Sequence, residues 1–125
     1  MLGFFIFTKK IHLVYLVIFR LEYIPQVYIM KYKELLIDNR SIKNEREINT
    51  ILKSQKFYWL IDSEMEEAKI EIKKNTIIWH SGDFYSGNWE YGIFKDGNFY
   101  GNWKNGIFEK GNFKGRWNSG LNNQN

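Results

Sequence analysis

Residues 101–120 read GNWKNGIFEKGNFKGRWNSG, with glycine returning every four or five residues and an aromatic residue two places after most of these glycines. The segments GNWEYGIFKDGNFY (87–100) and GNWKNGIFEKGNFK (101–114) are two copies of one 14-residue unit, and GRWNSG (115–120) begins a third. An internal repeat constrains the architecture more strongly than any single motif. The C-terminal half of the chain is therefore predicted to be a repeat array.

Most of the recurrent glycines follow a residue suited to a tight turn. The pairs are Tyr91-Gly92, Asp96-Gly97, Asn105-Gly106, Lys110-Gly111 and Ser119-Gly120. Asn-Gly and Asp-Gly are strong signals for two-residue hairpins, because a type I′ turn needs positive φ at both central positions. We therefore predict a series of hairpins, with Gly101 and Gly115 leaving room for neighbouring aromatic rings between the turns.

Hairpins at these pairs would place the aromatic residues in rows across the strands. Trp103, Phe108 and Phe113 would form one row, and the preceding unit would form a second, while polar residues would occupy the opposite face. A single unit cannot bury enough apolar surface to fold alone, so neighbouring units must stack. The predicted fold is α+β: short N-terminal helices followed by an antiparallel β-repeat meander, which forms an elongated twisted single sheet.

The rest of the chain divides by composition. Residues 1–29 form an apolar N-terminal segment, residues 30–55 a short helical cap, residues 56–120 a β-hairpin plus the repeat sheet, and residues 121–125 a polar tail.

Local patterns give the elements of the cap and the hairpin. Residues 31–39 are predicted to be helical, and a second helix begins at an Asn44 cap, with Glu47 at the capping-box spacing, and ends near Ser54. Strands are predicted at 56–62 and at 68–74, where apolar and charged residues alternate, with the acidic residues 62–67 as the link between them.

The apolar run at residues 11–19 is shorter than the ~20 residues that a spanning helix needs. Three alternatives stand for the segment that contains it: a weak membrane anchor, a buried apolar stretch, or residues upstream of a start at Met30. The chain contains no cysteine, which suits a reducing compartment and excludes disulfides and thiolate chemistry. We expect a cytoplasmic protein, with weak membrane anchoring left open.

The sequence offers little for catalysis, metal binding or nucleic acid. The two histidines, His12 and His80, are far apart, and Ser81 next to His80 would face the opposite side of a strand. The acidic residues Asp62, Glu64, Glu66 and Glu67 lack the spacing of a calcium loop. The net charge of +4 falls to +1 between Trp79 and Gly120, too little for a nucleic-acid surface. We expect no catalytic residue, metal or cofactor, and no enzyme.

Three octads share the pattern aromatic-x-Gly-x-Trp-x-x-Gly: YSGNWEYG (85–92), FYGNWKNG (99–106) and FKGRWNSG (113–120). This pattern resembles the core of the MORN repeat, a β-hairpin repeat that forms elongated sheets, although the 14-residue spacing is shorter. It is also similar to Trp/Gly-repeat proteins of bacteriophages and, more loosely, to aromatic-glycine cell-wall-binding repeats. The MORN resemblance implies a scaffold for protein contacts, sometimes at membranes, and not a catalyst.

The sequence therefore predicts a non-catalytic scaffold that binds a protein partner, or a second copy, through its aromatic face. The candidate binding residues are Trp89, Phe94, Phe99, Trp103, Phe108, Phe113 and Trp117. The same residues have a structural interpretation, as the hydrophobic core of the sheet. Two alternatives stand beside the scaffold: binding of a glycan by exposed tryptophans, and edge-to-edge assembly of a structural subunit through the strand near Trp117.

Overall fold

The structure, a computed structural model, describes residues 29–124, and the fold is that of the compact unit Lys31–Asn125 within this range. The predictions for residues 11–19 and His12 lie outside the described residues. The N-terminal elements are β1 (Tyr32–Ile37), β2 (Arg40–Ile42), α1 (Glu45–Ser54), α2 (Tyr58–Ile61), β3 (Glu64–Lys73) and β4 (Thr76–Ser86). Eight two-residue strands follow: β5 (Asn88–Trp89), β6 (Ile93–Phe94), β7 (Asn98–Phe99), β8 (Asn102–Trp103), β9 (Ile107–Phe108), β10 (Asn112–Phe113), β11 (Arg116–Trp117) and β12 (Leu121–Asn122).

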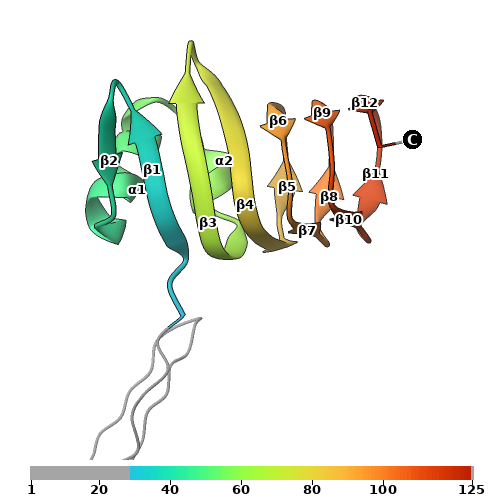
Figure 1. Ribbon diagram of the computed structural model, residues 1–125, viewed down its shortest axis with the longest axis horizontal. Coiled ribbons are helices and arrows are strands. Elements are labelled where there is room, and N and C mark those ends of the chain that lie inside the picture. The colour runs from blue at the N-terminus through green and yellow to red at the C-terminus, as the bar shows by residue number, and fades with distance from the viewer. Residues whose placement is uncertain (1–28, 125) are drawn as a thin grey trace, which may run out of the picture. The chain divides into compact units, whose positions relative to one another are not determined.

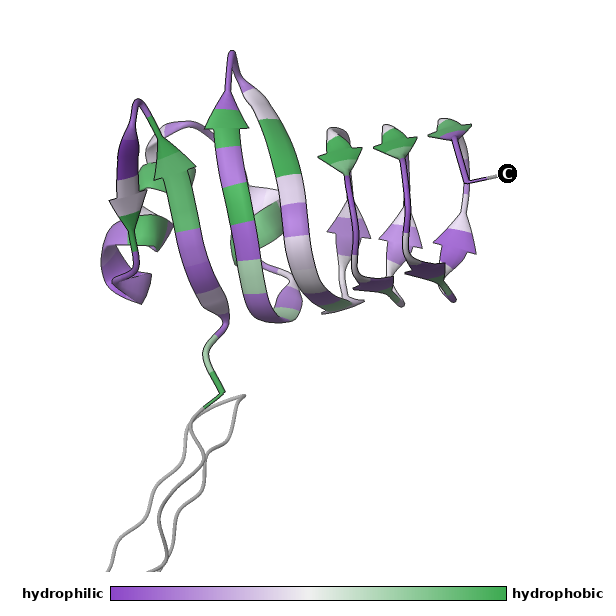
Figure 2. Ribbon diagram, viewed as in Figure 1, coloured by the Kyte–Doolittle hydropathy of each residue, from purple (hydrophilic) through white to green (hydrophobic). Residues whose placement is uncertain are grey.

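The first part of the unit is a mixed sheet with the two helices behind it (Figure 1). Strand β1 pairs antiparallel with β2 and parallel with β3, which pairs antiparallel with β4. The two hairpin turns, Asp38-Asn39 and Lys74-Asn75, have positive φ at both residues, as a type I′ turn requires. Along β3 apolar residues alternate with charged ones, which Figure 2 shows as alternating colours. The alternation predicted for residues 68–74 is thus confirmed.

The predicted helix that begins at Asn44 is also confirmed. The Asn44 side chain accepts a hydrogen bond from the Glu47 backbone N–H at 2.9 Å and so caps α1, while Ile48 and Leu52 are buried on its inner face. Among residues 29–124, no helix is both long and apolar enough to cross a membrane.

Three other local predictions are wrong. Residues 31–39 form β1 and its turn instead of a helix, because Leu35 and Ile37 alternate inward and the Asp38-Asn39 turn reverses the chain. Residues 56–62 contain α2 instead of a strand, since its short turn buries Leu60 in the core. Residues 64–67, four of the six residues of the predicted link at 62–67, belong to β3. For residues 31–39 and for residues 56–62, tertiary packing overrides the local propensity of the sequence.

The repeats correct the predicted fold class. They do not form an antiparallel meander: they wind into a β-solenoid in which each strand pairs in parallel with the strand one repeat later. The registers include Trp89 with Trp103 and Trp103 with Trp117, each 14 residues apart. The face made by β4, β6, β9 and β12 continues the sheet of the N-terminal part, while β5, β8 and β11 form a second sheet (Figure 1). Between residues 29 and 124 strands predominate, and the two helices described there are short.

The backbone conformation at the glycines explains the difference. At Asn105-Gly106 and Asp96-Gly97 only the glycine has positive φ, 121° and 128°, so neither pair is a type I′ turn. Each pair therefore bends the chain at a corner instead of reversing it. Only three or four residues separate successive corner glycines, which is too few for the strands of a hairpin.

We call each circuit of the solenoid a rung: the first comprises residues 80–94, the second 95–108 and the third 109–122. The solenoid interior is continuous with the core between the helices and the sheet. Helix α2 closes the first rung, because the Trp59 ring meets the Trp89 ring edge-on at 5.0 Å. The N-terminal part thus caps one end of the solenoid.

Candidate functional site

Three stacked columns of aromatic rings fill the solenoid. In one, Trp89, Trp103 and Trp117 stack at centroid distances of 5.2 and 5.3 Å, with interplanar angles of 7° and 5°. The other two columns have separations of 4.8 to 5.3 Å and consist of Trp79, Phe94 and Phe108, and of Phe84, Phe99 and Phe113. Rings of neighbouring columns meet edge-on, as Phe99 and Trp103 do at 5.3 Å. Such pairs stabilise by ~0.5–1.5 kcal/mol beyond the burial of their area.

The structure thus separates the seven predicted binding residues into two groups. Five of them have 0% exposed surface: Trp89, Phe94, Phe99, Trp103 and Phe108. Phe113 and Trp117 are only partly buried, because they lie in the third rung. The structural interpretation as core therefore describes the first five, and Phe113 and Trp117 are the ones a partner can reach.

The predicted row of Trp103, Phe108 and Phe113 does not exist as cross-strand neighbours. In the parallel register each of these residues pairs with a residue one rung away, for example Trp103 with Trp89. The three rings meet instead around the interior, where Trp103 lies 5.6 Å from Phe108. These three residues do share one apolar surface, but that surface is the inner wall of the solenoid and not one face of a flat sheet.

The corner glycines allow the rungs to approach closely. A Cβ added to Gly106 would lie 2.4 Å from the Gly92 carbonyl oxygen and 3.1 Å from Nε1 of Trp89. At Gly115, whose φ is not positive, a Cβ would lie 2.1 Å from the Gly101 carbonyl oxygen. Side chains at these corners would force the rungs apart and break the ring stacking.

The third rung is the open end of the solenoid. Its strands β10, β11 and β12 each pair on one side only, so they are edge strands within residues 29–124. In the earlier rungs, carbonyl oxygens accept hydrogen bonds from the next rung, such as Lys114 N to Phe99 O at 2.8 Å and Asn118 N to Trp103 O at 2.9 Å. The equivalent oxygens of Phe113 and Trp117 face no further rung in the described range.

One residue at the open end departs from the aromatic pattern. Asn122 occupies the position that Phe94 and Phe108 hold in the first two rungs. The column that contains Phe94 and Phe108 therefore ends in an exposed polar side chain, whereas the other two columns end in the rings of Phe113 and Trp117. The open end is a mixed surface of two aromatic rings, one amide and unpaired strand edges.

Charge changes systematically toward this end. The first rung contains Asp83 and Glu90 and no Lys or Arg, a charge of −2. The second contains two lysines and one acid, +1, and the third contains three bases and one acid, +2. Between residues 110 and 124 there are three bases, Lys110, Lys114 and Arg116, and no acid. Sequence reasoning treated the repeat charge as one sum, and counting it repeat by repeat would have revealed this gradient.

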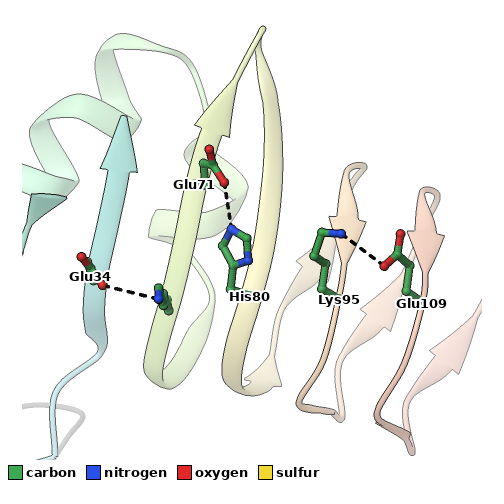
Figure 3. A network of polar contacts seen from close by, with 6 residues as sticks. Glu34, Glu71, His80, Lys95 and Glu109 are labelled. Atoms are coloured by element: carbon green, nitrogen blue, oxygen red, sulfur yellow. Dashed lines mark hydrogen bonds and ion pairs between the residues drawn. The ribbon is translucent and has the colours of Figure 1, made fainter. Parts of the chain in front are cut away.

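Ion pairs connect adjacent rungs at the 14-residue spacing. Lys95 pairs with Glu109 at 3.4 Å, and Lys110 approaches Asp96 at 4.0 Å. The row of polar contacts in Figure 3 continues across the outer face of the sheet, where His80 of β4 contacts Glu71 of β3 at 2.8 Å. His80 thus lies within a strand, and its imidazole has a carboxylate neighbour instead of Ser81.

A ladder of amides runs along another outer face. The Asn112 amide donates to Asn98 at 3.0 Å, and the Asn98 amide donates to Asp83 at 2.7 Å. Beside it, the exposed rings of Tyr85 and Tyr100 stack on each other at 5.4 Å. Burial, together with the negative charges of Asp83 and Glu66, raises the pKa of Tyr85 to about 12. These tyrosines cover each other and do not present one flat platform to solvent.

Neither a metal site nor a deep cavity stands out in the described residues. Within 29–124, no group of three or more histidine, aspartate or glutamate side chains could hold a metal ion. A shallow depression of about 500 Å³ lies beside α1 and is lined by Glu45, Arg46, Asn49, Thr50, Lys53 and Ile61. Its charges are mixed, and the hydroxyl of Thr50 donates a hydrogen bond to the Arg46 backbone carbonyl at 3.0 Å. The open end is therefore the candidate functional site.

No protein-family model matches the chain, and neither a curated protein nor a solved structure matches it significantly. The resemblance to the MORN repeat therefore stays a prediction from the three octads.

Proposed function

We propose that this protein is a non-catalytic interaction module that binds a partner polypeptide at the open end of its solenoid by β-strand addition. The observation that carries the proposal is the set of three edge strands, β10, β11 and β12, around the partly exposed rings of Phe113 and Trp117. Strand addition combines backbone hydrogen bonds with pockets or rings that select side chains. The third rung offers both.

The asymmetry of the molecule supports this site. The first rung is closed by α2 and the N-terminal sheet, so its aromatic rings are buried. The third rung has edge strands that nothing in residues 29–124 covers. Solenoids stack rung upon rung and need caps at their ends, because an uncovered edge is a template for pairing. A partner segment that pairs with β10, β11 and β12 would cover these edge strands.

The two alternatives fit the geometry less well. Glycan binding by exposed tryptophans would need several open indole faces, but Trp79, Trp89 and Trp103 are fully buried, and Trp117 is partly buried. Symmetric end-to-end assembly of two copies would bring two third rungs together, each with a charge of +2, and like charges placed opposite each other destabilise such a pairing. A partner of different sequence avoids this repulsion.

A peptide library displayed on phage and selected on the full chain tests the proposal. Enriched peptides should protect the amides of residues 111–123 from hydrogen exchange, and should lose binding to a Phe113→Ser/Trp117→Ser variant. A Tyr85→Ser/Tyr100→Ser variant is the matched control, since it removes two exposed rings from another face. Circular dichroism checks that both variants fold. Peptides that protect another face, and that bind the Phe113/Trp117 variant equally well, would contradict the proposal.

A further inference from the structure

We propose that the segment that binds the open end is acidic, an inference that rests on the proposed function. The first observation is the charge gradient along the solenoid, from −2 in the first rung to +2 in the third. The increase is in the direction of the edge strands. A partner that pairs with the third rung therefore meets the most basic part of the solenoid.

The second observation is that two of these basic side chains have no ionic partner. Lys110 approaches Asp96 of the rung before it, but Lys114 and Arg116 form no ion pair with any residue between 29 and 124. Both belong to the third rung, on either side of Gly115. Their charges are thus available to a chain that adds to the edge.

The third observation is how the existing rungs match their charges. In two ion pairs, Lys95–Glu109 and Asp96–Lys110, a charged residue faces a residue of opposite charge at the same position of the next rung. Extended by one rung, this pattern places acids of the partner opposite Lys114 and Arg116. Complementary charges across an interface raise the association rate and select the partner.

A polypeptide fits this site better than a nucleic acid does. The edge strands present backbone groups at the spacing of a parallel β-ladder, which another peptide backbone can pair with. A phosphate backbone carries no N–H donors for the carbonyl oxygens of Phe113 and Trp117. A single-stranded DNA competitor in the experiment below distinguishes the two.

The experiment uses two labelled 14-residue peptides derived from the chain's own repeat. The native peptide, residues 101–114 with blocked ends, carries three lysines and one glutamate, a charge of +2. The acidic peptide carries Lys104→Glu, Lys110→Glu and Lys114→Glu, which gives a charge of −4. Both keep the glycine and aromatic positions, so they differ only in charge. Binding to the full chain is measured by fluorescence anisotropy.

The acidic peptide should bind roughly tenfold more tightly at low salt, and the preference should shrink in ~0.5 M salt, because exposed charges are screened there. A Lys114→Glu/Arg116→Glu variant of the chain should reverse the preference and bind the native peptide better. A Lys33→Glu/Lys73→Glu variant, which reverses two exposed charges outside the solenoid, should leave it unchanged. This reversal is a result that a general loss of folding cannot produce.

Other outcomes separate the inference from the proposed function. If both peptides bind equally and protect the third rung, strand addition stands and the acidic partner is wrong. If neither binds, both the inference and the proposed function are contradicted. A 14-nucleotide single-stranded DNA that competes as well as the acidic peptide would show a general polyanion surface, and would overturn the assignment to an acidic polypeptide.

Discussion

At the scale of single residues, neighbouring positions along the repeat have opposite roles. Phe99 is fully buried, with its ring stacked between Phe84 at 4.8 Å and Phe113 at 5.2 Å, whereas the next residue, Tyr100, is 41% exposed on the outer face. The side chains of adjacent strand residues point to opposite faces. One position in the sequence therefore separates a core residue from a surface residue.

This contrast gives the first prediction. Phe99→Ala should lower the free energy of unfolding by ~3–5 kcal/mol, because it removes the middle ring of a buried column. Tyr100→Ala should cost less than ~1 kcal/mol, the usual range for an exposed position. Urea denaturation followed by circular dichroism measures both. Equal costs for the two substitutions would show that the aromatic row does not form the core.

The second prediction concerns two glycines with the same geometry at opposite ends of the solenoid. Gly92 and Gly120 have φ of 123° and 117°, and an added Cβ would lie 2.5 and 2.4 Å from a backbone oxygen. Gly92→Ala should destabilise the whole unit by more than ~2 kcal/mol, since a strained φ and a clash combine there. Gly120→Ala should only loosen the third rung, leaving the urea midpoint nearly unchanged and lowering the slope. Matching midpoints for the two variants would argue against independent behaviour of the end rung.

The third prediction concerns alkaline pH. Burial, with a smaller contribution from Glu45, raises the pKa of Tyr32 well above its ordinary value of 10.0. The folded state therefore keeps a proton that the unfolded state releases, so stability is full below pH ~10 and falls as the pH rises above it. Tyr32→Phe should flatten this fall, although it loses the hydrogen bond to Asn49 at 2.7 Å. Urea midpoints between pH 8 and 11 test this, and parallel pH profiles for the two proteins would contradict it.

At the scale of elements, the difference between a hairpin and a corner decides the fold. A hairpin turn has positive φ at two residues, as at Asp38-Asn39, whereas the corners at Asp96-Gly97 and Asn105-Gly106 have it at the glycine alone. The repeat sequence identified where the chain bends and which residues are apolar. It did not state whether a strand pairs with the next strand or with the strand one repeat later.

The spacing of the corners distinguishes pairing with the next strand from pairing with the strand one repeat later. The hairpin strands β3 and β4 have 10 and 11 residues, whereas the strands between glycine corners have two. Two-residue strands cannot support a hairpin ladder, but they can stack in parallel on many rungs. Helix α1 was predictable because its cap and its apolar face are local signals. Helix α2 was not, since its contacts with Trp89 and Tyr91 are distant in sequence.

The candidate site was predictable only in part. Phe113 and Trp117 were named from the repeat pattern, but their difference from the other five aromatic residues depends on which rung is last. Lys114 and Arg116 were missed because the charge of the repeats was summed over their whole length. The role of a residue at a solenoid end follows from what covers it, and that is a property of the fold.

The fourth prediction is a gradient of local stability along the rungs. The second rung pairs on both sides, while the third pairs on one side only. Amides of residues 116–123 should therefore exchange with solvent faster than those of residues 102–109, because edge elements open at lower free energy. Hydrogen exchange followed by mass spectrometry measures both segments in one experiment. Equal protection would mean that another part of the chain, or a second copy, covers the open end.

At the scale of the whole molecule, the N-terminal sheet with its helices and the repeats share one continuous core but have different roles. The sheet and helices at residues 32–86 close one end of the solenoid, and the repeats extend from them along one direction. The charge gradient follows the same direction. The proposed binding of an acidic segment at the open end depends on this polarity, which an antiparallel sheet with equivalent repeats would not have.

The most direct test of the account is a nuclear Overhauser spectrum of the isotopically labelled protein. The parallel solenoid predicts contacts between backbone protons of residues 14 apart, such as Asn98 with Asn112 and Asn102 with Arg116. It also predicts none of the close contacts that a hairpin at Asn105-Gly106 would create between Lys104 and Ile107. Observation of the 14-residue contacts would establish the register that places the aromatic columns inside and the third rung at the end. Contacts between Lys104 and Ile107, with the 14-residue contacts missing, would contradict the account.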